Sequence, residues 1–465
     1  MLPLAAFYNN DSGLWGDNDW WTSANQLETV IDYSRETGDP TYFAELENTF
    51  SKNSAASFDK WGYYDDDGWW AISWIKAYDL THQQKYLDMA KTIFQRMSGG
   101  WDAKCGGGIY WASAKAGNDG LKNKNAIPNS LFLQVAAKLH QRTPGDAGAG
   151  SYLDWAEREW SWFKATGMLT DKHQVVDGLT NLTDCKPSGP IFTYNQGVLL
   201  GGLVDLAAAK QDESLLDEAS AIAKATMTLM ADANGVLKEA PCGGDICVQF
   251  KGVFMRNLAL LYRARPSLEL QLYMRKQSDQ LWQNNRNDQD QFGYEWHLPF
   301  DKATAGRQSS ALDALLSAVA SSSMNLALGA SASGSTPCTP GSAATLALDG
   351  SSRLDSKWCS GGAGDQSLTV DLGVPRGIVG FRLRHAGAGG ENPAWNTKDF
   401  ELLVSNDTQT WFPVAAVQGN TADITTHPIS SVNARYVKLH VTTAQTDPAN
   451  LAARIYELEI LGQGL

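Results

Sequence analysis

Apolar positions in the first 322 residues recur with a helical period. Spacings near i, i+3, i+4 and i+7 mark about ten segments that are separated by glycine-bearing loops. The predicted helices span residues 23–38, 69–81, 84–97, 129–142, 152–166, 193–210, 212–230, 251–264, 271–285 and 311–322. Some are apolar on nearly every face, which suits an inner ring, whereas others are apolar on one face, which suits an outer ring. We therefore expect a toroid of helical hairpins.

The pattern changes from about Asn325 onward. Glycine, serine and threonine become frequent, and short runs alternate apolar with polar positions. These runs are residues 367–373, 378–385, 399–406, 434–443 and 454–461. Strands at this spacing with turn residues between them predict an all-β sandwich. We expect a helical domain over 1–324 and a β domain over 325–465, with the boundary at 322–326.

Composition and charge exclude several classes of protein. Hydrophobic residues make up 43% of the chain, which is typical of a globular protein, and no apolar run has the length of a membrane-spanning helix. The net charge of −13 argues against a nucleic-acid partner. Residues 1–10 lack the basic and apolar regions of a signal peptide. If the protein is exported, we expect that its signal is absent from this sequence.

The chain has six cysteines, and none of them has the spacing of a zinc or redox motif. They are either six buried thiols of a cytosolic protein or the disulfides of an exported one. We favour disulfides, and hence secretion. The expected pairs are Cys242–Cys247, Cys338–Cys359 and, by elimination, Cys105–Cys185.

Residues 63–70, YYDDDGWW, place three aspartates between two pairs of aromatic residues. A helix N-terminus favours acidic residues, but this explains one carboxylate, best assigned to Asp67, and not three. Glycosidic bond cleavage uses two carboxyl groups that flank one bond, about 5 Å apart in retaining enzymes. Repulsion between such neighbours raises the pKa of one of them, so that it stays protonated as the acid. Asp65 and Asp66 are therefore catalytic candidates.

Tryptophan is abundant, with 17 residues, most of them before residue 170. In three segments, 14–25, 61–70 and 106–111, aromatic residues stand beside glycine, aspartate or asparagine. Such a mixture either packs a core or lines a carbohydrate cleft, where rings stack on sugars and short polar side chains bind hydroxyls. We favour the cleft. Its candidate substrate-binding residues are Trp21, Asn25, Tyr64 and Trp111.

The segment YYDDDGWWAISWIKAYDLT, residues 63–81, resembles the catalytic segment of glycoside hydrolase family 76, the endo-α-1,6-mannanases of bacteria and fungi. The resemblance continues through 13–25, 106–111, 124–139, 193–206 and 250–259. It implies an (α/α)6 barrel and a retaining mechanism that uses two consecutive aspartates. On this motif Asp65 would be the nucleophile and Asp66 the acid/base, whereas Asp67 falls on a variable position.

The same resemblance implies cleft roles for Trp111, Asn195, Gln196 and Lys251, and it implies no cofactor for catalysis. Each residue also has a structural alternative. Asn195 and Gln196 would be polar caps of a helix N-terminus, Trp111 a core residue, and Lys251 a solvated lysine.

Residues 325–463 resemble the discoidin-like jelly roll, the F5/8 type C domain, which serves as a family 32 carbohydrate-binding module in bacterial glycosidases. The resemblance implies a structural Ca²⁺ at Asp349 and Glu457, completed by backbone carbonyls around 350–356. In the alternative, Asp349 starts a turn and binds no metal. The residues of the expected ligand loop are Trp395 together with His385, Glu391 and Asn392, whereas Trp358 is expected in the core.

These observations together predict a secreted, monomeric, retaining endo-hydrolase that cleaves α-1,6-mannan, with the polysaccharide as its partner. Three alternatives stay open: a transglycosylase on the same scaffold, another (α/α)6 enzyme such as an unsaturated glucuronyl hydrolase or an α-glucan hydrolase, and a carbohydrate-binding protein without catalysis. The presence of both Asp65 and Asp66 argues against the last alternative.

Overall fold

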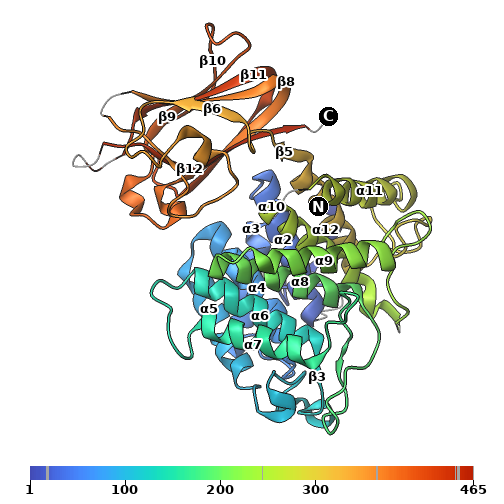
Figure 1. Cartoon of the computed structure of the whole chain (residues 1–465). Coiled ribbons are helices and arrows are strands. Elements are labelled where there is room, and N and C mark those ends of the chain that lie inside the picture. Colours follow the sequence, from blue (N-terminus) through green and yellow to red (C-terminus); the bar gives the residue numbers. More distant parts are fainter. Residues whose placement is uncertain are drawn as a thin grey trace. The chain divides into compact units, whose positions relative to one another are not determined.

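The computed structural model describes residues 1–16, 20–242, 244–265, 267–362, 365–445, 447 and 451–463. The chain divides into two compact units, Met1–Ser321 and Ser322–Leu465 (Figure 1). Asp17, Asn18 and Asp19 of the N-terminal motif lie outside the described residues.

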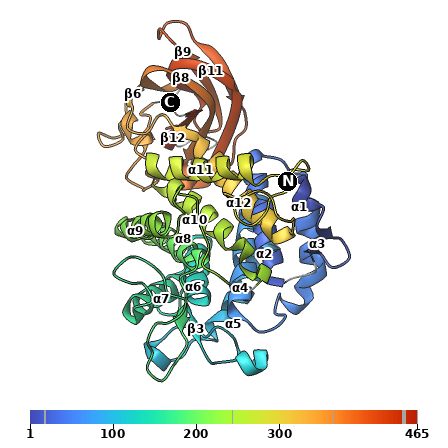
Figure 2. The same ribbon diagram turned by 90° about the vertical axis from the view of Figure 1, so that its right-hand side faces the viewer.

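The first unit is an (α/α)6 barrel, as expected (Figures 1 and 2). Its inner helices are α2 (Trp20–Thr37), α4 (Tyr64–Thr81), α6 (Ala126–Gln141), α8 (Thr193–Lys210), α10 (Phe250–Ala264) and α12 (Ala305–Ser322). Its outer helices are α1 (Leu2–Ala5), α3 (Phe43–Asn53), α5 (Gln84–Ser98), α7 (Tyr152–Thr166), α9 (Ser214–Leu229) and α11 (Leu268–Asn284). The helical period predicted all of them except α1 and α3.

Small residues let the inner helices approach closely. A Cβ on Gly197 of α8 would lie 2.6 Å from the backbone of Phe254 in α10, and one on Gly252 of α10 would lie 2.5 Å from Ser310 in α12. Glycine destabilises the interior of a helix, so its presence at these two positions reflects the close approach of the neighbouring helices. The ring closes where Thr29 Oγ1 of α2 donates to Asp313 Oδ1 of α12 at 2.8 Å.

A hairpin precedes each of five inner helices, and a side-chain oxygen accepts from a buried backbone N–H on its second strand. In four of them this oxygen belongs to the fourth residue of the helix that follows. The bonds are Trp15 N–Ser23 Oγ at 3.1 Å, Ile109 N–Asn129 Oδ1 at 2.7 Å, Val175 N–Gln196 Oε1 at 2.7 Å and Phe292 N–Gln308 Oε1 at 3.1 Å. The fifth N–H, that of Leu237, donates to Gln277 of α11 at 2.9 Å. We call these bonds the hairpin clamps.

All three expected disulfides are present, Cys105–Cys185, Cys242–Cys247 and Cys338–Cys359, although Gly243 inside the second loop lies outside the described residues. No helix in the described ranges combines the length and the apolar character that a membrane crossing requires.

The second unit is all-β, as expected. Its strands are β5 (Ser323–Asn325), β6 (Ser331–Gly334), β7 (Trp358–Cys359), β8 (Gln366–His385), β9 (Asp399–Ser405), β10 (Phe412–Val417), β11 (Ile424–Thr443) and β12 (Arg454–Gln463). They pair in the order β10-β9-β11-β8-β12-β5, with β6 on β8 and β7 on β12. The runs predicted at 367–373 and 378–385 form one continuous strand, β8. Trp358 is fully buried in the core, as expected.

Candidate active site

The first turns of several inner helices meet at one end of the barrel. Aromatic contacts show this convergence: Trp21 of α2 lies 6.4 Å from Trp69 of α4 and 6.2 Å from Phe250 of α10, measured between ring centroids. Phe250 in turn stacks on Tyr194 of α8 at 3.7 Å, with the rings nearly parallel. Helix N-termini carry partial positive charge, so this end of the barrel favours carboxylates.

Asp65 lies in the first turn of α4 and is held by two donors. The indole Nε1 of Trp111 donates to its Oδ2 at 2.9 Å, and the backbone N–H of Asp66 donates to its Oδ1 at 3.1 Å. Burial raises the pKa of Asp65 to about 6, although the Trp111 hydrogen bond opposes the shift. Trp111 itself is half-buried, and its ring lies 4.9 Å from that of Tyr63. The structure therefore places Trp111 on a candidate catalytic carboxylate.

The two residues that follow differ in their surroundings. Asp66 is 8% exposed, beside Asp65. Asp67 instead receives a two-pronged bond from Arg96 of α5, with nitrogen–oxygen distances of 2.7 and 2.9 Å. Burial raises the pKa of Asp67, and the Arg96 charge opposes that shift. This contact ties Asp67 to the scaffold, which agrees with its omission from the catalytic pair.

A third carboxylate, which the sequence motifs did not indicate, lies close to Asp65. Asp177 stands in the loop between α7 and α8, where Asn195 Nδ2 donates to it at 3.1 Å and Asn125 Nδ2 at 3.3 Å. Burial raises its pKa, and its charge contributes to the raised pKa of Asp65. Within the described residues the side-chain oxygens of Asn125 and Asn195 are buried without a hydrogen-bond partner. A single loop aspartate forms no motif, so sequence reasoning had no signal for it.

Two of the sequence candidates face the scaffold. The ring of Tyr64 is 6% exposed and packs against Gly100, where an added Cβ would lie 2.6 Å from it. Gln196 is fully buried, and its amide binds only backbone, namely Val175 N at 2.7 Å, Val175 O at 2.8 Å and Phe192 O at 3.0 Å. Among the described residues no hydrogen bond joins either side chain to Asp65.

Lys251, in the first turn of α10, is fully buried and is therefore not a solvated lysine. Its Nζ donates to Tyr294 O at 2.7 Å, lies 3.7 Å from a Glu295 oxygen, and is 4.7 Å from the ring centroids of both Tyr294 and Trp296. Burial lowers its pKa to about 8. The nearby Glu239 carboxylate, which binds Thr193, has its pKa raised to about 7 by burial.

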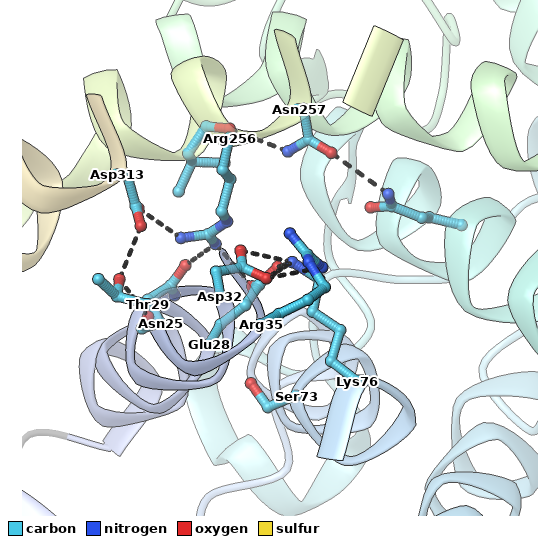
Figure 3. A network of polar contacts seen from close by, with 12 residues as sticks. Asn25, Glu28, Thr29, Asp32, Arg35, Ser73, Lys76, Arg256, Asn257 and Asp313 are labelled. Carbon is cyan, nitrogen blue, oxygen red and sulfur yellow. Dashed lines mark hydrogen bonds and ion pairs between the residues drawn. The ribbon is translucent and has the colours of Figure 1, made fainter. Parts of the chain in front are cut away.

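Asn25 belongs to a buried ionic layer further along the inner helices (Figure 3). Its Nδ2 donates to Trp21 O at 3.1 Å, and its Oδ1 accepts from Arg256. Arg256 also pairs with Glu28 and with Asp313, both at 2.9 Å.

The layer extends around the whole ring of inner helices. Lys76 of α4 joins Glu28 at 2.6 Å and Asp32 at 2.8 Å. On the other side Asp205 of α8 accepts from Lys138 of α6. We call this set the ionic layer, and it underlies the aromatic contacts of Trp21 and Trp69.

In the β unit, the expected ligand loop is tied to its neighbours. Trp395 is half-buried, its Nε1 donates to Asp447 at 3.2 Å, and the guanidinium of Arg454 lies 4.7 Å from its ring. Glu391 pairs with Lys357 at 2.7 Å, and Asn392 caps the short helix Pro393–Trp395. His385 ends β8 and is fully buried, which lowers its pKa to about 3. It is therefore a neutral core residue.

The expected calcium ligands lie near each other. Glu457 is 2% exposed and accepts from Gly350 N at 3.1 Å and Asn325 Nδ2 at 3.3 Å. Burial raises its pKa to about 8, with further contributions from the like charges of Glu459 and Asp349. A buried carboxylate beside a second one, with backbone close by, fits the oxygen-rich donor set of a hard cation. Across the described ranges, no three His, Cys, Asp or Glu side chains cluster as a metal site.

Comparison with known proteins agrees with both units. Residues 329–456 match the F5/8 type C domain. The chain is 27% identical over 271 residues to mannan endo-1,6-alpha-mannosidase DCW1 of Eremothecium gossypii, covering 53% of this chain and 58% of that protein. It is 34% identical over 149 residues to mannan endo-1,6-alpha-mannosidase DFG5 of Saccharomyces cerevisiae, covering 30% and 31%. It therefore spans less than two thirds of these relatives.

Solved structures share the fold of the helical unit. An inactive variant of the alpha-1,6-mannanase GH76A of Salegentibacter sp. HEL1_6, in complex with alpha-1,6-mannotriose, is 22% identical with a TM-score of 0.59, covering 69% of this chain and 97% of that one. Dfg5 of Chaetomium thermophilum, in complex with glucosamine, is 21% identical with a TM-score of 0.61, covering 69% and 87%. The model of glycosyl hydrolase family 76 matches residues 4–328, well over half of the chain, so the protein belongs to this family.

Proposed function

We propose that the protein is a secreted endo-hydrolase that cleaves α-1,6-mannosidic bonds of mannan with retention of configuration. The observation that carries the proposal is the pair Asp65 and Asp66 in the first turn of α4, with Trp111 holding one carboxylate. The carboxyl groups of these consecutive residues would supply the nucleophile and the acid/base that a retaining glycosidase requires.

In the proposed mechanism Asp65 is the nucleophile. Its carboxylate attacks the anomeric carbon while Asp66 donates its proton to the leaving glycosidic oxygen, so that the C–O bond breaks as a glycosyl–Asp65 ester forms. Asp66, now ionised, takes a proton from water, and the water attacks the anomeric carbon and releases Asp65. The donors Trp111 Nε1 and Asp66 N–H favour the ionised form of Asp65.

Further residues around the pair support a sugar site. The buried amide oxygens of Asn125 and Asn195 are acceptors that sugar hydroxyls would satisfy. Asp177 holds both amides and adds a further acceptor. The ring faces of Trp21, Tyr194 and Trp111 supply apolar surface for the sugar rings.

The choice of mannan rests on the named relatives. The curated relatives are endo-1,6-alpha-mannosidases, and the Salegentibacter enzyme was inactivated at two consecutive aspartates and holds alpha-1,6-mannotriose. This agrees with the assignment of Asp65 and Asp66. Secretion is supported by the three disulfides, which form in oxidising compartments.

For the β unit we propose a carbohydrate-binding role, with Trp395 in the ligand loop. We further propose that Asp349 and Glu457 hold a structural Ca²⁺, which would compensate the burial of Glu457. Catalysis itself uses no metal in this proposal.

The test is the digestion of mannan reduced to its α-1,6 backbone. The wild type should release oligosaccharides whose first-formed anomer is α, as followed by proton NMR; a first-formed β anomer would exclude retention. Asp65→Asn and Asp66→Asn should each lower the rate about 100-fold or more, because neither carboxylate performs the other's step. Asp67→Asn, which loses only the Arg96 contact, is the matched control. Products longer than the substrate would indicate transglycosylation.

The pH profile gives a second readout. Asp65 must be ionised to attack, and its pKa is raised to about 6 by burial, so kcat/KM should fall as the pH drops below about 6. A profile that is flat from pH 7 to pH 5 would contradict the assignment of Asp65.

A further inference from the structure

Lys124 is a fully buried lysine near the site, and it has no part in the proposed mechanism. Its side chain is fully buried, and its Nζ lies 2.6 Å from Asp102 Oδ1, 2.7 Å from Gly107 O, 2.9 Å from Gly108 O and 2.9 Å from Lys104 O. An ammonium group has only three hydrogens, so these acceptors share them. Removing such a charge from water is unfavourable unless acceptors replace the water.

The acceptors of Lys124 all belong to one turn, residues 102–108, in the loop between α5 and α6. Backbone dihedrals with φ of +146° at Gly107 and +79° at Gly108 turn these carbonyls toward the ammonium. The aromatic ring of Tyr110 lies 4.9 Å from Nζ, and its hydroxyl donates to Asp102 at 2.7 Å. The Lys124 ammonium thus contacts oxygens from the beginning to the end of this turn.

This turn leads directly to Trp111, and the backbone beside Lys124 holds Trp111 from the other side. Trp111 N donates to Asn123 O at 2.8 Å, and Tyr64 N donates to Trp111 O at 2.9 Å. Lys124 therefore joins the 102–108 turn, which precedes Trp111, to the segment at Asn123 that bonds the Trp111 backbone. The indole of Trp111 in turn bonds Asp65.

We propose that Lys124 is a positioning residue, whose buried ammonium fixes the 102–108 turn and thereby sets Trp111 against Asp65. This inference rests on the proposed role of Asp65 as nucleophile. Lys124 touches no reacting atom; it acts through the indole. Loss of the ammonium leaves the turn carbonyls without their donor and releases Trp111 from Asp65.

The test is Lys124→Met, with Lys115→Met as the matched control. Lys115 lies in the same loop but is half exposed, and it binds Asp59 at 3.0 Å. Lys124→Met should lower kcat/KM at pH 6 by about 10- to 100-fold, the scale of a misplaced catalytic group, mainly through kcat. The acid limb should also move to higher pH, because Asp65 loses a donor to its ionised form. Lys115→Met should match the wild type.

Other titratable groups face Asp65, and they are unchanged in these variants. They are Asp66, Asp67 and Tyr63 on or beside α4, Asp177 from the loop before α8, and Tyr194 on α8. A movement of the acid limb in Lys124→Met therefore reports the Trp111–Asp65 contact. A folded Lys124→Met with the wild-type limb and rate would overturn the inference.

A double-variant cycle separates positioning from general loosening. If Lys124 acts through Trp111, Lys124→Met should add nothing to the acid-limb shift of Trp111→Phe; additive shifts would refute this route. If Lys124→Met does not fold, Asp102→Asn replaces it, since it removes the partner charge at a half-exposed position and should give a smaller shift in the same direction. An active Asp65→Asn would instead overturn the proposed function itself.

Discussion

The ionic layer makes the stability of the barrel depend on Arg256. This residue is 8% exposed, and its guanidinium bonds Asn25, Glu28 and Asp313. In Arg256→Met both carboxylates lose this partner, although Lys76 still pairs with Glu28. Removing one member of a buried ionic group destabilises by about 3–5 kcal/mol, because the remaining charge stays buried and unpaired.

The midpoint of thermal unfolding of a large domain changes by about 2–4 °C per kcal/mol, so in Arg256→Met it should fall by roughly 10 °C. The assay is thermal unfolding of the full chain, followed by tryptophan fluorescence. The matched control is Lys85→Met, which breaks the exposed pair with Glu47 and should change stability by less than about 1 kcal/mol. A loss in Arg256→Met no larger than in this control would refute the reasoning.

The pH dependence of this loss has a definite sign. Burial already raises the pKa of Asp313 to about 6, and Arg256 opposes that shift. Without Arg256 the folded-state pKa rises further above the unfolded value, so the variant is penalised most at pH 7 and recovers as the pH falls and Asp313 takes up a proton. The stability difference from the wild type should therefore be smaller at pH 5 than at pH 7.

Two further predictions concern the β unit. A chain that ends at Ser322 should still fold and cleave soluble oligosaccharide at the full-length rate, but bind insoluble mannan more weakly, because tethered sites raise the local concentration; equal binding in a sedimentation assay would remove the binding role. Added Ca²⁺ should raise the unfolding temperature of the β unit in the wild type and not in Glu457→Gln, as ligand binding to the folded state requires; equal shifts in both, measured by calorimetry, would exclude this site.

The helical recurrence of apolar positions predicted the barrel, because most of its helices bury a continuous row of apolar side chains. The missed helix α3 has 11 residues and buries only Leu46 and Thr49, so few of its positions belong to the core. In the β unit, β10 was missed because none of its residues is buried, and alternation is a signal of burial on one face.

The candidate pair Asp65 and Asp66 could be proposed from the sequence because both members lie in one short motif. Asp177, Tyr194 and Phe250 come from three other segments, and only closure of the ring brings them near Asp65. The side chains of sequence neighbours also point in different directions, because each helical residue is turned by about 100° from the one before it. Tyr64 therefore packs against Gly100 whereas Asp65 bonds Trp111. Likewise Gln196 bonds Val175 whereas Asn195 bonds Asp177.

The hairpin clamps separate the closing of the barrel interior from the shape of its mouth. Each clamp joins a buried strand N–H to a helix side chain, as with Val175 and Gln196, so the stretch between them is not needed for that contact. In that stretch, residues 180–190 are largely exposed. Exchanges there that keep the buried Leu182 and the Cys105–Cys185 disulfide would reshape the rim without breaking the clamp. Grafting such a stretch between relatives is therefore a direct way to vary the surroundings of the proposed site.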